Sequence, residues 1–169
     1  MRNSILAVLG VAVALSLGFA VAGLASSGSS SGAAAETNES TTESPSATTW
    51  KATLRAAAAT PRPTGVNAGA GGTFSATVKE QGGTYSAKWK LTFKSLTGKA
   101  VAAHIHKGKV GKAGAVVVAL CGPCTSGKAG TTKLSEAVVK AMKAGLAYVN
   151  VHTKKNPAGE IRGQVKKVG

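Results

Sequence analysis

The three histidines are the residues of this chain most able to do chemistry. His104 and His106 are two positions apart in one apolar segment, and His152 lies in another segment near the C-terminus. In a β-strand, side chains two residues apart leave the same face at roughly 6–7 Å, within reach of one metal ion. Three imidazoles with one open position suit Zn²⁺ or Cu²⁺. The sequence thus offers His104, His106 and His152 as a copper or zinc site, provided that the two segments are sheet neighbours.

The two cysteines, Cys121 and Cys124, form a Cys-Gly-Pro-Cys motif. In thioredoxin-like proteins the first cysteine begins a helix, whose dipole lowers the pKa of the thiol. Here the motif follows an apolar run and precedes Thr-Ser-Gly-Lys, with no helical pattern behind it. We therefore expect a disulfide between Cys121 and Cys124, in preference to a redox role or a thiolate ligand for a metal.

The acidic residues of the chain are six glutamates, and aspartate is absent. Aspartic-protease dyads, Ser-His-Asp triads and EF-hand loops are therefore excluded. We assign no catalytic residue. The composition favours a binding or structural module without catalytic activity, and the histidines leave a metal-binding, and even redox, protein as the alternative.

Apolar and polar residues alternate with a period of two over 73–79 and 84–94, which is the pattern of half-buried strands. Gln-Gly-Gly at 81–83 lies between them and predicts a hairpin turn. The alternation places the aromatic rings of the second segment in the core and its lysines outside. An earlier strand is expected over 50–55.

The same alternation places Val101, Ala103 and Ile105 in the core and turns the neighbouring histidines the other way. The run 115–120 is continuously apolar and β-branched, which predicts a strand covered on both sides. Residues 135–144 are the one helical candidate, with Ser135 as the N-cap and Gly145 after its end.

Segments 146–152 and 160–165 flank a Lys-Lys-Asn-Pro-Ala-Gly turn and predict a second hairpin. Closing it predicts three cross-strand pairs that share one face: His152 with Glu160, Asn150 with Arg162, and Tyr148 with Gln164. We expect this to be an outer patch that gathers all three histidines. Asn150, Glu160, Arg162 and Gln164 could orient the metal ligands there. The alternative is a metal-free network in which Glu160 pairs with Arg162 or His152.

These elements predict an all-β domain over residues 50–169, a β-sandwich or small barrel with Greek-key-like connections and one short helix. Four segments also closely resemble the CHRD domain, the module named after chordin: AHIHKG at 103–108, GAVVVALCG at 114–122, YVNVHT at 148–153 and NPAGEIRGQ at 156–164. The resemblance covers roughly residues 50–166. It is weaker in the first half, where the family commonly has an acidic residue before a proline and this chain reads AAATP at 57–61.

The resemblance implies an extracellular β-sandwich or barrel, often compared with the fold of copper/zinc superoxide dismutase. In chordin such domains belong to a secreted binder of growth-factor ligands, so the resemblance makes an extracellular protein a candidate partner. A dismutase activity is disfavoured, because that copper site uses four histidines and its zinc site needs aspartate, whereas this chain has three histidines and no aspartate.

The N-terminus predicts export. Residues 1–25 hold one arginine and then an apolar run ending in small residues, which is typical of a secretory signal peptide, cleaved or retained as an anchor. Residues 26–49 are rich in Ser, Thr and Gly, and are expected to be a disordered linker. The protein should then be secreted or associated with the cell envelope, and should meet a membrane only through an uncleaved N-terminal segment.

The chain is strongly basic, with a formal net charge of +15. Residues 50–169 hold 20 of the 21 basic residues and three of the six acids, so the charge lies on the predicted domain. Nucleic acid is disfavoured as a partner, because the rings that could stack on bases are expected in the core. An anionic envelope polymer remains a candidate partner, and lysines that only keep the surface solvated are the alternative.

Overall fold

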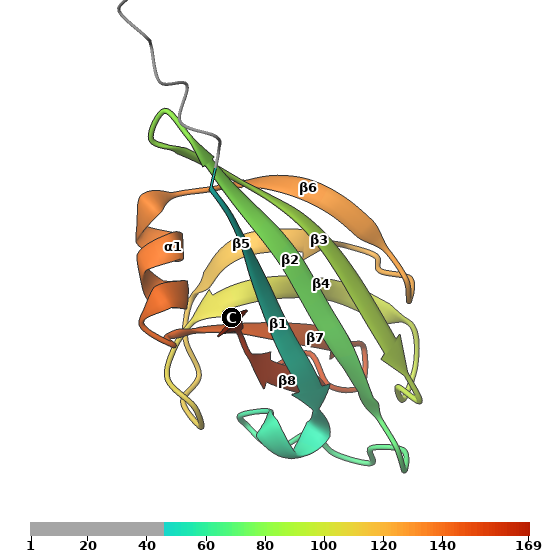
Figure 1. The fold of residues 1–169 in the computed structure, drawn as a ribbon. Helices are drawn as coiled ribbons and strands as arrows, with labels where there is room; N and C mark the ends of the chain where they lie inside the picture. Colours follow the sequence, from blue (N-terminus) through green and yellow to red (C-terminus); the bar gives the residue numbers. More distant parts are fainter. Residues whose placement is uncertain (1–45) are drawn as a thin grey trace, which may run out of the picture. The chain divides into compact units, whose positions relative to one another are not determined.

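The computed structural model describes residues 46–169, which form a curved antiparallel sheet and one short α-helix (Figure 1). The elements in chain order are β1 (Ala47–Arg55), η1 (Ala56–Ala58), β2 (Gly71–Gln81), β3 (Thr84–Lys94), β4 (Ala100–Lys107), β5 (Val116–Cys121), β6 (Ala129–Leu134), α1 (Glu136–Lys143), β7 (Ala147–Thr153), β8 (Ile161–Gln164) and β9 (Lys166–Val168). The signal peptide and residues 26–45 of the predicted linker lie outside the described residues. Strand β1 begins at Ala47, three residues before the strand predicted from Trp50.

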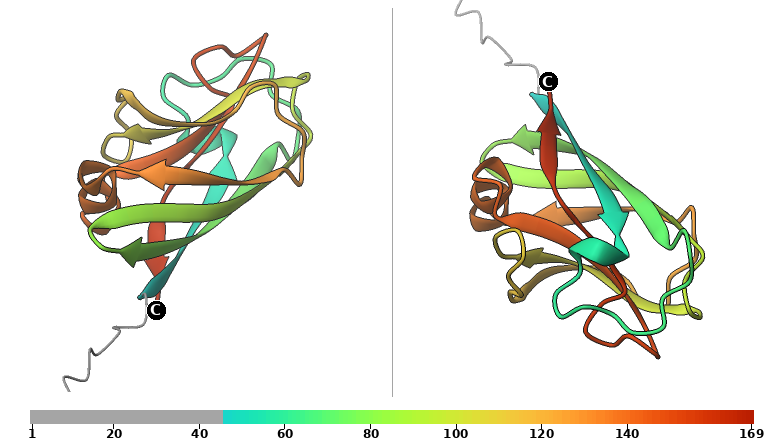
Figure 2. Two further views of the ribbon diagram at one scale, coloured as in Figure 1. Left: turned by 90° about the horizontal axis from the view of Figure 1, so that it is seen from above. Right: turned by 90° about the horizontal axis from the view of Figure 1, so that it is seen from below.

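The strands follow the order β5-β4-β7-β8-β1-β2-β3-β6, and β9 pairs with β1. The sheet curls around one interior into a nearly closed barrel or sandwich (Figure 2). Three connections, β3 to β4, β5 to β6 and β6 through α1 to β7, cross between the two halves of this order. The all-β fold class is therefore confirmed. Within residues 46–169, no helix is long and apolar enough to cross a membrane.

The core is built from rows in which large side chains face small ones. Ala76 lies between Trp50 and Trp89 across three strands, and Phe74 lies between Ala52 and Leu91. All six are buried. Such pairing lets a chain rich in alanine and poor in aromatics still fill its interior, because each ring occupies the space that the neighbouring alanine leaves.

The predicted hairpins and the helix are confirmed. The β2–β3 turn is formed by Gly82 and Gly83, both at positive φ, as a two-residue turn between twisted strands requires. Helix α1 begins after Ser135, whose hydroxyl accepts a hydrogen bond from the backbone amide of Val138. It ends before Gly145, at φ +68°.

Two predictions about core positions are wrong. The pairing of β4 with β7 is irregular between Ala100 and Ala102, and this shift turns Val101 outward, where it is 37% exposed, while Ala100 packs in the core. Strand β5 lies at one end of the order, and it is not covered on both faces, because Val116 and Val117 are 51% and 36% exposed. A short apolar run fits an edge strand as well as a central one, because its pattern carries no information about its neighbours.

Candidate metal centre

The three histidines lie on one face of the adjacent antiparallel strands β4 and β7. The register places His152 opposite Ala102, Asn150 opposite His104 and Tyr148 opposite His106. The opposite face carries Ala103, Ile105, Val149 and Val151, which are fully or almost fully buried in the core. Small Ala102 leaves room for the ring of His152 to lie beside that of His104. The predicted convergence of the histidines on one face is therefore present.

The rings are close enough to share one ion. Nδ1 of His104 lies 3.2 Å from Nε2 of His152. The ring centroid of His106 is 5.7 Å from each of the other two centroids. One ring nitrogen from each histidine can be chosen so that all lie within 4.8 Å of one another. A tetrahedral ion with bonds of about 2.1 Å holds its ligand atoms about 3.4 Å apart. The cluster thus needs only small side-chain rotations to close on a metal.

Two backbone carbonyls fix the proton on the far side of two rings. Nδ1 of His106 donates to the carbonyl of Gly114 at 2.9 Å, and Nδ1 of His152 donates to the carbonyl of Pro157 at 2.9 Å. Because a carbonyl oxygen only accepts, each Nδ1 carries a proton, and in the neutral ring the lone pair is then on Nε2. A histidine ligand held through its other ring nitrogen is the usual arrangement at metal sites.

Burial favours the metal-binding form of His104 and His106. His106 and His152 are 7% and 8% exposed, and His104 is half-buried. Burial lowers the pKa of His104, and its two histidine neighbours lower it further. Burial also lowers the pKa of His106, although its hydrogen bond to Gly114 opposes this shift. Both rings therefore favour the neutral state, in which a lone pair is free for a metal.

This face is covered, which corrects the expectation of an outer patch. All seven residues of β7 are buried. The loop between β4 and β5 packs over the face: the Gly114 amide donates to the Tyr148 hydroxyl at 3.0 Å, and the Tyr148 ring stacks on His106 with centroids 4.9 Å apart. Strand alternation predicts which side faces away from the core, but it does not predict a loop that folds over that side.

Arg162 and Gln164 hold this loop in place. The guanidinium of Arg162 lies 3.4 Å from the Tyr148 ring centre and donates to the carbonyls of Lys109 and Lys112, each at 2.8 Å. Gln164 donates to the carbonyls of Gly108 and Gly145 at 2.8 and 2.7 Å. The two residues therefore act on the histidines indirectly, through the loop that carries Gly114.

Asn150 supports the second covering segment, the turn that contains Pro157. Its side-chain amide donates to the carbonyl of Ala158 at 3.0 Å, next to the carbonyl that orients His152. Its Oδ1 is buried and has no hydrogen-bond partner. The turn approaches Asn150 so closely at Gly159, where φ is +122°, that a Cβ there would collide with the amide group.

Glu160 does not join the histidine face, so both of its expected pairings, with Arg162 and with His152, are wrong. Its carboxylate is fully buried in a separate cluster, where it accepts hydrogen bonds from the Thr97 amide at 2.7 Å, the Thr97 and Thr153 hydroxyls, and the Asn156 side-chain amide at 3.2 Å. Glu160 precedes β8, so the turn and not the strand alternation sets its direction. Among residues 46–169 the one ion pair joins Lys140 and Glu136.

The cysteines form the predicted disulfide, with Cα atoms 5.4 Å apart. It closes the turn after β5, where the Cys124 amide also donates to the carbonyl of Ala100. Both sulfur atoms are therefore engaged, and thiolate is removed from the available metal ligands.

The sequence reasoning missed Tyr148 as a direct neighbour of His106, and the carbonyls of Gly114 and Pro157. The register alone places Tyr148 opposite His106, so that contact was within reach of a strand-pairing argument. The signal for the loop is weaker: a Cβ at Gly114 would collide with the Lys107 carbonyl, so a glycine there allows the close return of the chain.

Comparison with known proteins gives one match. A family model described as the CHRD domain matches residues 50–165. No curated protein and no solved structure matches the chain.

Proposed function

The chain belongs to the CHRD domain family, and we propose that it is an extracellular module of that family that holds one copper or zinc ion between His104, His106 and His152. One observation carries this proposal. Nε2 of His106 is buried without a hydrogen-bond partner, although Nδ1 of the same ring is fixed to Gly114. A buried lone pair with no donor costs about 1–3 kcal/mol. A cation shared with the two neighbouring rings would remove that cost.

The available atoms favour a site made of imidazole nitrogens. The cysteine sulfurs are joined to each other, and the carboxylate of Glu160 is engaged with Thr97, Thr153 and Asn156. Three neutral imidazoles accept both Zn²⁺ and Cu²⁺, and by the general order of affinities copper binds more tightly. We therefore expect Cu²⁺ to displace Zn²⁺ from this protein.

The role that we propose is binding and structural, with no catalytic residue assigned. An ion at this place would tie β4 to β7 beneath the loop that Arg162 fixes. The disulfide and the predicted signal peptide support a location outside the cell, since disulfides persist in oxidising compartments.

The test is metal binding by the full chain, purified without a histidine tag and stripped with a chelator. Titration calorimetry with Zn²⁺ and Cu²⁺ should give one ion per chain. His104→Gln and His106→Gln should each weaken binding by about 100-fold or more, because each removes one of three ligands.

Thr97→Val is the matched control. It removes a hydroxyl that donates to buried Glu160 and so lowers stability without touching a histidine. It should keep the affinity of the parent protein. If neither metal binds at micromolar concentration, or if His104→Gln binds as well as the parent, the proposal is wrong and the cluster is a hydrogen-bonded network closed by the His104–His152 contact.

A further inference from the structure

The outer face of strands β1, β2, β3 and β6 carries an ordered set of cations and hydroxyls. We call it the lysine–threonine face, and it consists of the outward-pointing residues of these four strands. The register aligns them in rows across the sheet: Arg55–Gly71–Lys94, Thr53–Thr73–Thr92, Lys51–Ser75–Lys90, Thr49–Thr77–Lys88 and Ala47–Lys79–Ser86. All of these residues are exposed or half-buried. The first and third rows thus hold two cations each, the second and fourth are rich in hydroxyls, and the fifth holds one cation and one hydroxyl.

No acidic residue has a place in these rows. Of the glutamates in residues 46–169, Glu80 lies opposite Tyr85 in the inward-facing register, Glu136 is paired with Lys140, and Glu160 is buried in its own cluster. Strand β6 adds a further cation, Lys133, opposite Ser86. The positive charge of this face is therefore unneutralised, which attracts polyanions over distances of about a Debye length, ~8–10 Å.

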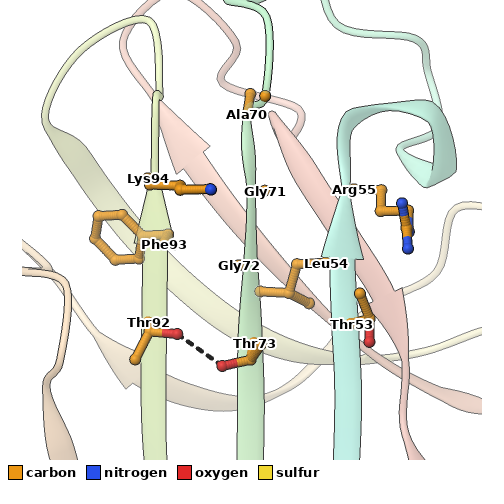
Figure 3. Close-up of a pocket in the computed structure, with 11 residues that line it drawn as sticks. Thr53, Leu54, Arg55, Ala70, Gly71, Gly72, Thr73, Thr92, Phe93 and Lys94 are labelled. Atoms are coloured by element: carbon orange, nitrogen blue, oxygen red, sulfur yellow. Dashed lines mark hydrogen bonds between the residues drawn. The ribbon is translucent and has the colours of Figure 1, made fainter.

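The face is also hollowed in two places. One groove of about 470 Å³ lies at the Gly71 end, where Gly71 has no side chain to cover the backbone and Arg55 and Lys94 stand on either side (Figure 3). The hydroxyls of Thr73 and Thr92 are joined by a hydrogen bond beside it. A second groove, of about 690 Å³, lies along the same strands and is lined by Lys88, Lys90 and several threonines. An extended chain can therefore lie close to the backbone between flanking ammonium groups.

We propose that the lysine–threonine face binds an acidic polysaccharide, a sugar polymer that carries carboxylates along its length. The ammonium groups would meet the carboxylates, and the threonine and serine hydroxyls can both donate to and accept from sugar hydroxyls. The rows contain no aromatic side chain, because Trp50, Phe74 and Trp89 all point into the core. The face thus lacks the stacking platforms on which single-stranded nucleic acids depend.

The spacing of the cations suits a polymer better than a small ion. Successive outward residues of a strand are about 7 Å apart, and positions two strands apart are about 10 Å apart. Lys51 and Lys90 stand in this second relation, on either side of Ser75. A single carboxylate could therefore meet few of these cations at once, whereas a chain with repeated carboxylates could meet several. This inference does not depend on the histidine site.

The experiment compares two triple variants of the full chain that lose the same charge. The first variant removes three ammonium groups from the centre of the face: Lys51→Gln/Lys88→Gln/Lys90→Gln. The second removes three exposed lysines elsewhere: Lys99→Gln/Lys143→Gln/Lys154→Gln. With polygalacturonate as the probe, at low salt, the first variant should bind at least about tenfold more weakly than the parent, and the second within about threefold, because close charges outweigh distant screened ones. Binding by the parent should also weaken steeply as salt is raised.

Uncharged dextran and single-stranded DNA are the comparison ligands, and circular dichroism melting confirms that both variants are folded. Dextran should not bind, and DNA should bind more weakly than polygalacturonate per unit charge. Equal losses in the two triple variants would show that net charge alone is responsible and would overturn the proposal. Preferential binding of DNA would replace the proposed partner with nucleic acid, and failure of polygalacturonate to bind would also reject the proposal.

Discussion

Two regions of this barrel present polar side chains on the side away from the core, and they differ in what lies above them. On β4 and β7 the polar residues are covered by two loops, and His106, His152 and Asn150 are buried. On β1, β2, β3 and β6 the polar residues are open to solvent. Apolar and polar residues alternate with a period of two in both sets of strands. The alternation therefore identifies which side chains point away from the core, but not whether those side chains are exposed to solvent.

The covering decides which polar groups each region can hold. A buried polar group needs a partner, and on the histidine face His106, His152, Asn150 and Arg162 each reach a backbone carbonyl of a covering loop. The lysine–threonine face needs no such partners, because water satisfies its ammonium groups. Arg162 on the covered side therefore fixes a loop through its hydrogen bonds, whereas Arg55 and the lysines on the open side are hydrated.

Removing one cation from each region should show this difference most strongly. Arg162→Met keeps the apolar stem but loses both charged hydrogen bonds to the loop, and it should lower the free energy of unfolding by about 3 kcal/mol. Lys90→Gln, on the open face, should leave it nearly unchanged. Urea denaturation measures the free energy of unfolding of both variants. If the two substitutions lower it by the same small amount, Arg162 does not hold the loop.

Metal binding should separate the regions in a second way. At a free Cu²⁺ concentration of about 100 times its dissociation constant, the parent protein should gain about 2.7 kcal/mol of stability. The triple variant Lys51→Gln/Lys88→Gln/Lys90→Gln should gain the same amount, whereas His106→Gln, which should bind the ion at least about 100-fold more weakly, should gain no more than about 0.4 kcal/mol. Thermal melting with and without the ion tests this, and a reduced gain in the lysine variant would show that the two regions are coupled.

The smallest effect concerns the buried carboxylate beside the histidine face. Burial by itself would raise the pKa of Glu160, but the hydrogen bonds from Thr153, Thr97 and Asn156 outweigh it, and the pKa is lowered. A lowered folded pKa means that the contribution of Glu160 is complete above the ordinary glutamate pKa of about 4.3 and is lost as the pH falls through the folded value.

Glu160→Gln should therefore cost about 2 kcal/mol near neutral pH, because donors that faced a charge would face an amide. The difference from the parent should shrink below about pH 4. Urea denaturation between pH 7 and pH 3 measures it. Glu136→Gln, on the exposed helix, is the control and should leave stability nearly unchanged. A cost for Glu160→Gln that stays constant across this range would contradict the lowered pKa.

The sequence predicted those parts of the fold that depend on neighbouring residues. The strands of 73–94, the Gly82-Gly83 turn and the cap at Ser135 follow from local pattern and backbone preference, and all three are present. The pairing of Asn150 with Arg162 followed from the length of one turn. The second, weaker class of prediction depended on unbroken alternation. It failed at Val101, where the pairing of β4 with β7 is irregular, and at Glu160, which precedes β8.

The covering of the histidines could not be predicted in this way. It depends on contacts between distant parts of the chain, such as the guanidinium of Arg162 on the carbonyls of Lys109 and Lys112. Within residues 108–115, Gly114 indicates a close return of the chain but not which face the loop covers. The edge position of β5 was missed for the same reason, since strand order is set by long-range pairing.

The pairing of β9 with β1 brings the beginning and the end of residues 46–169 together, with Val168 opposite Thr49 (Figure 2). Sequences joined to these two positions would start from adjoining points of the barrel. Residues 46–169 could therefore be spliced as a cassette into a surface loop of a host protein with little rearrangement of either partner.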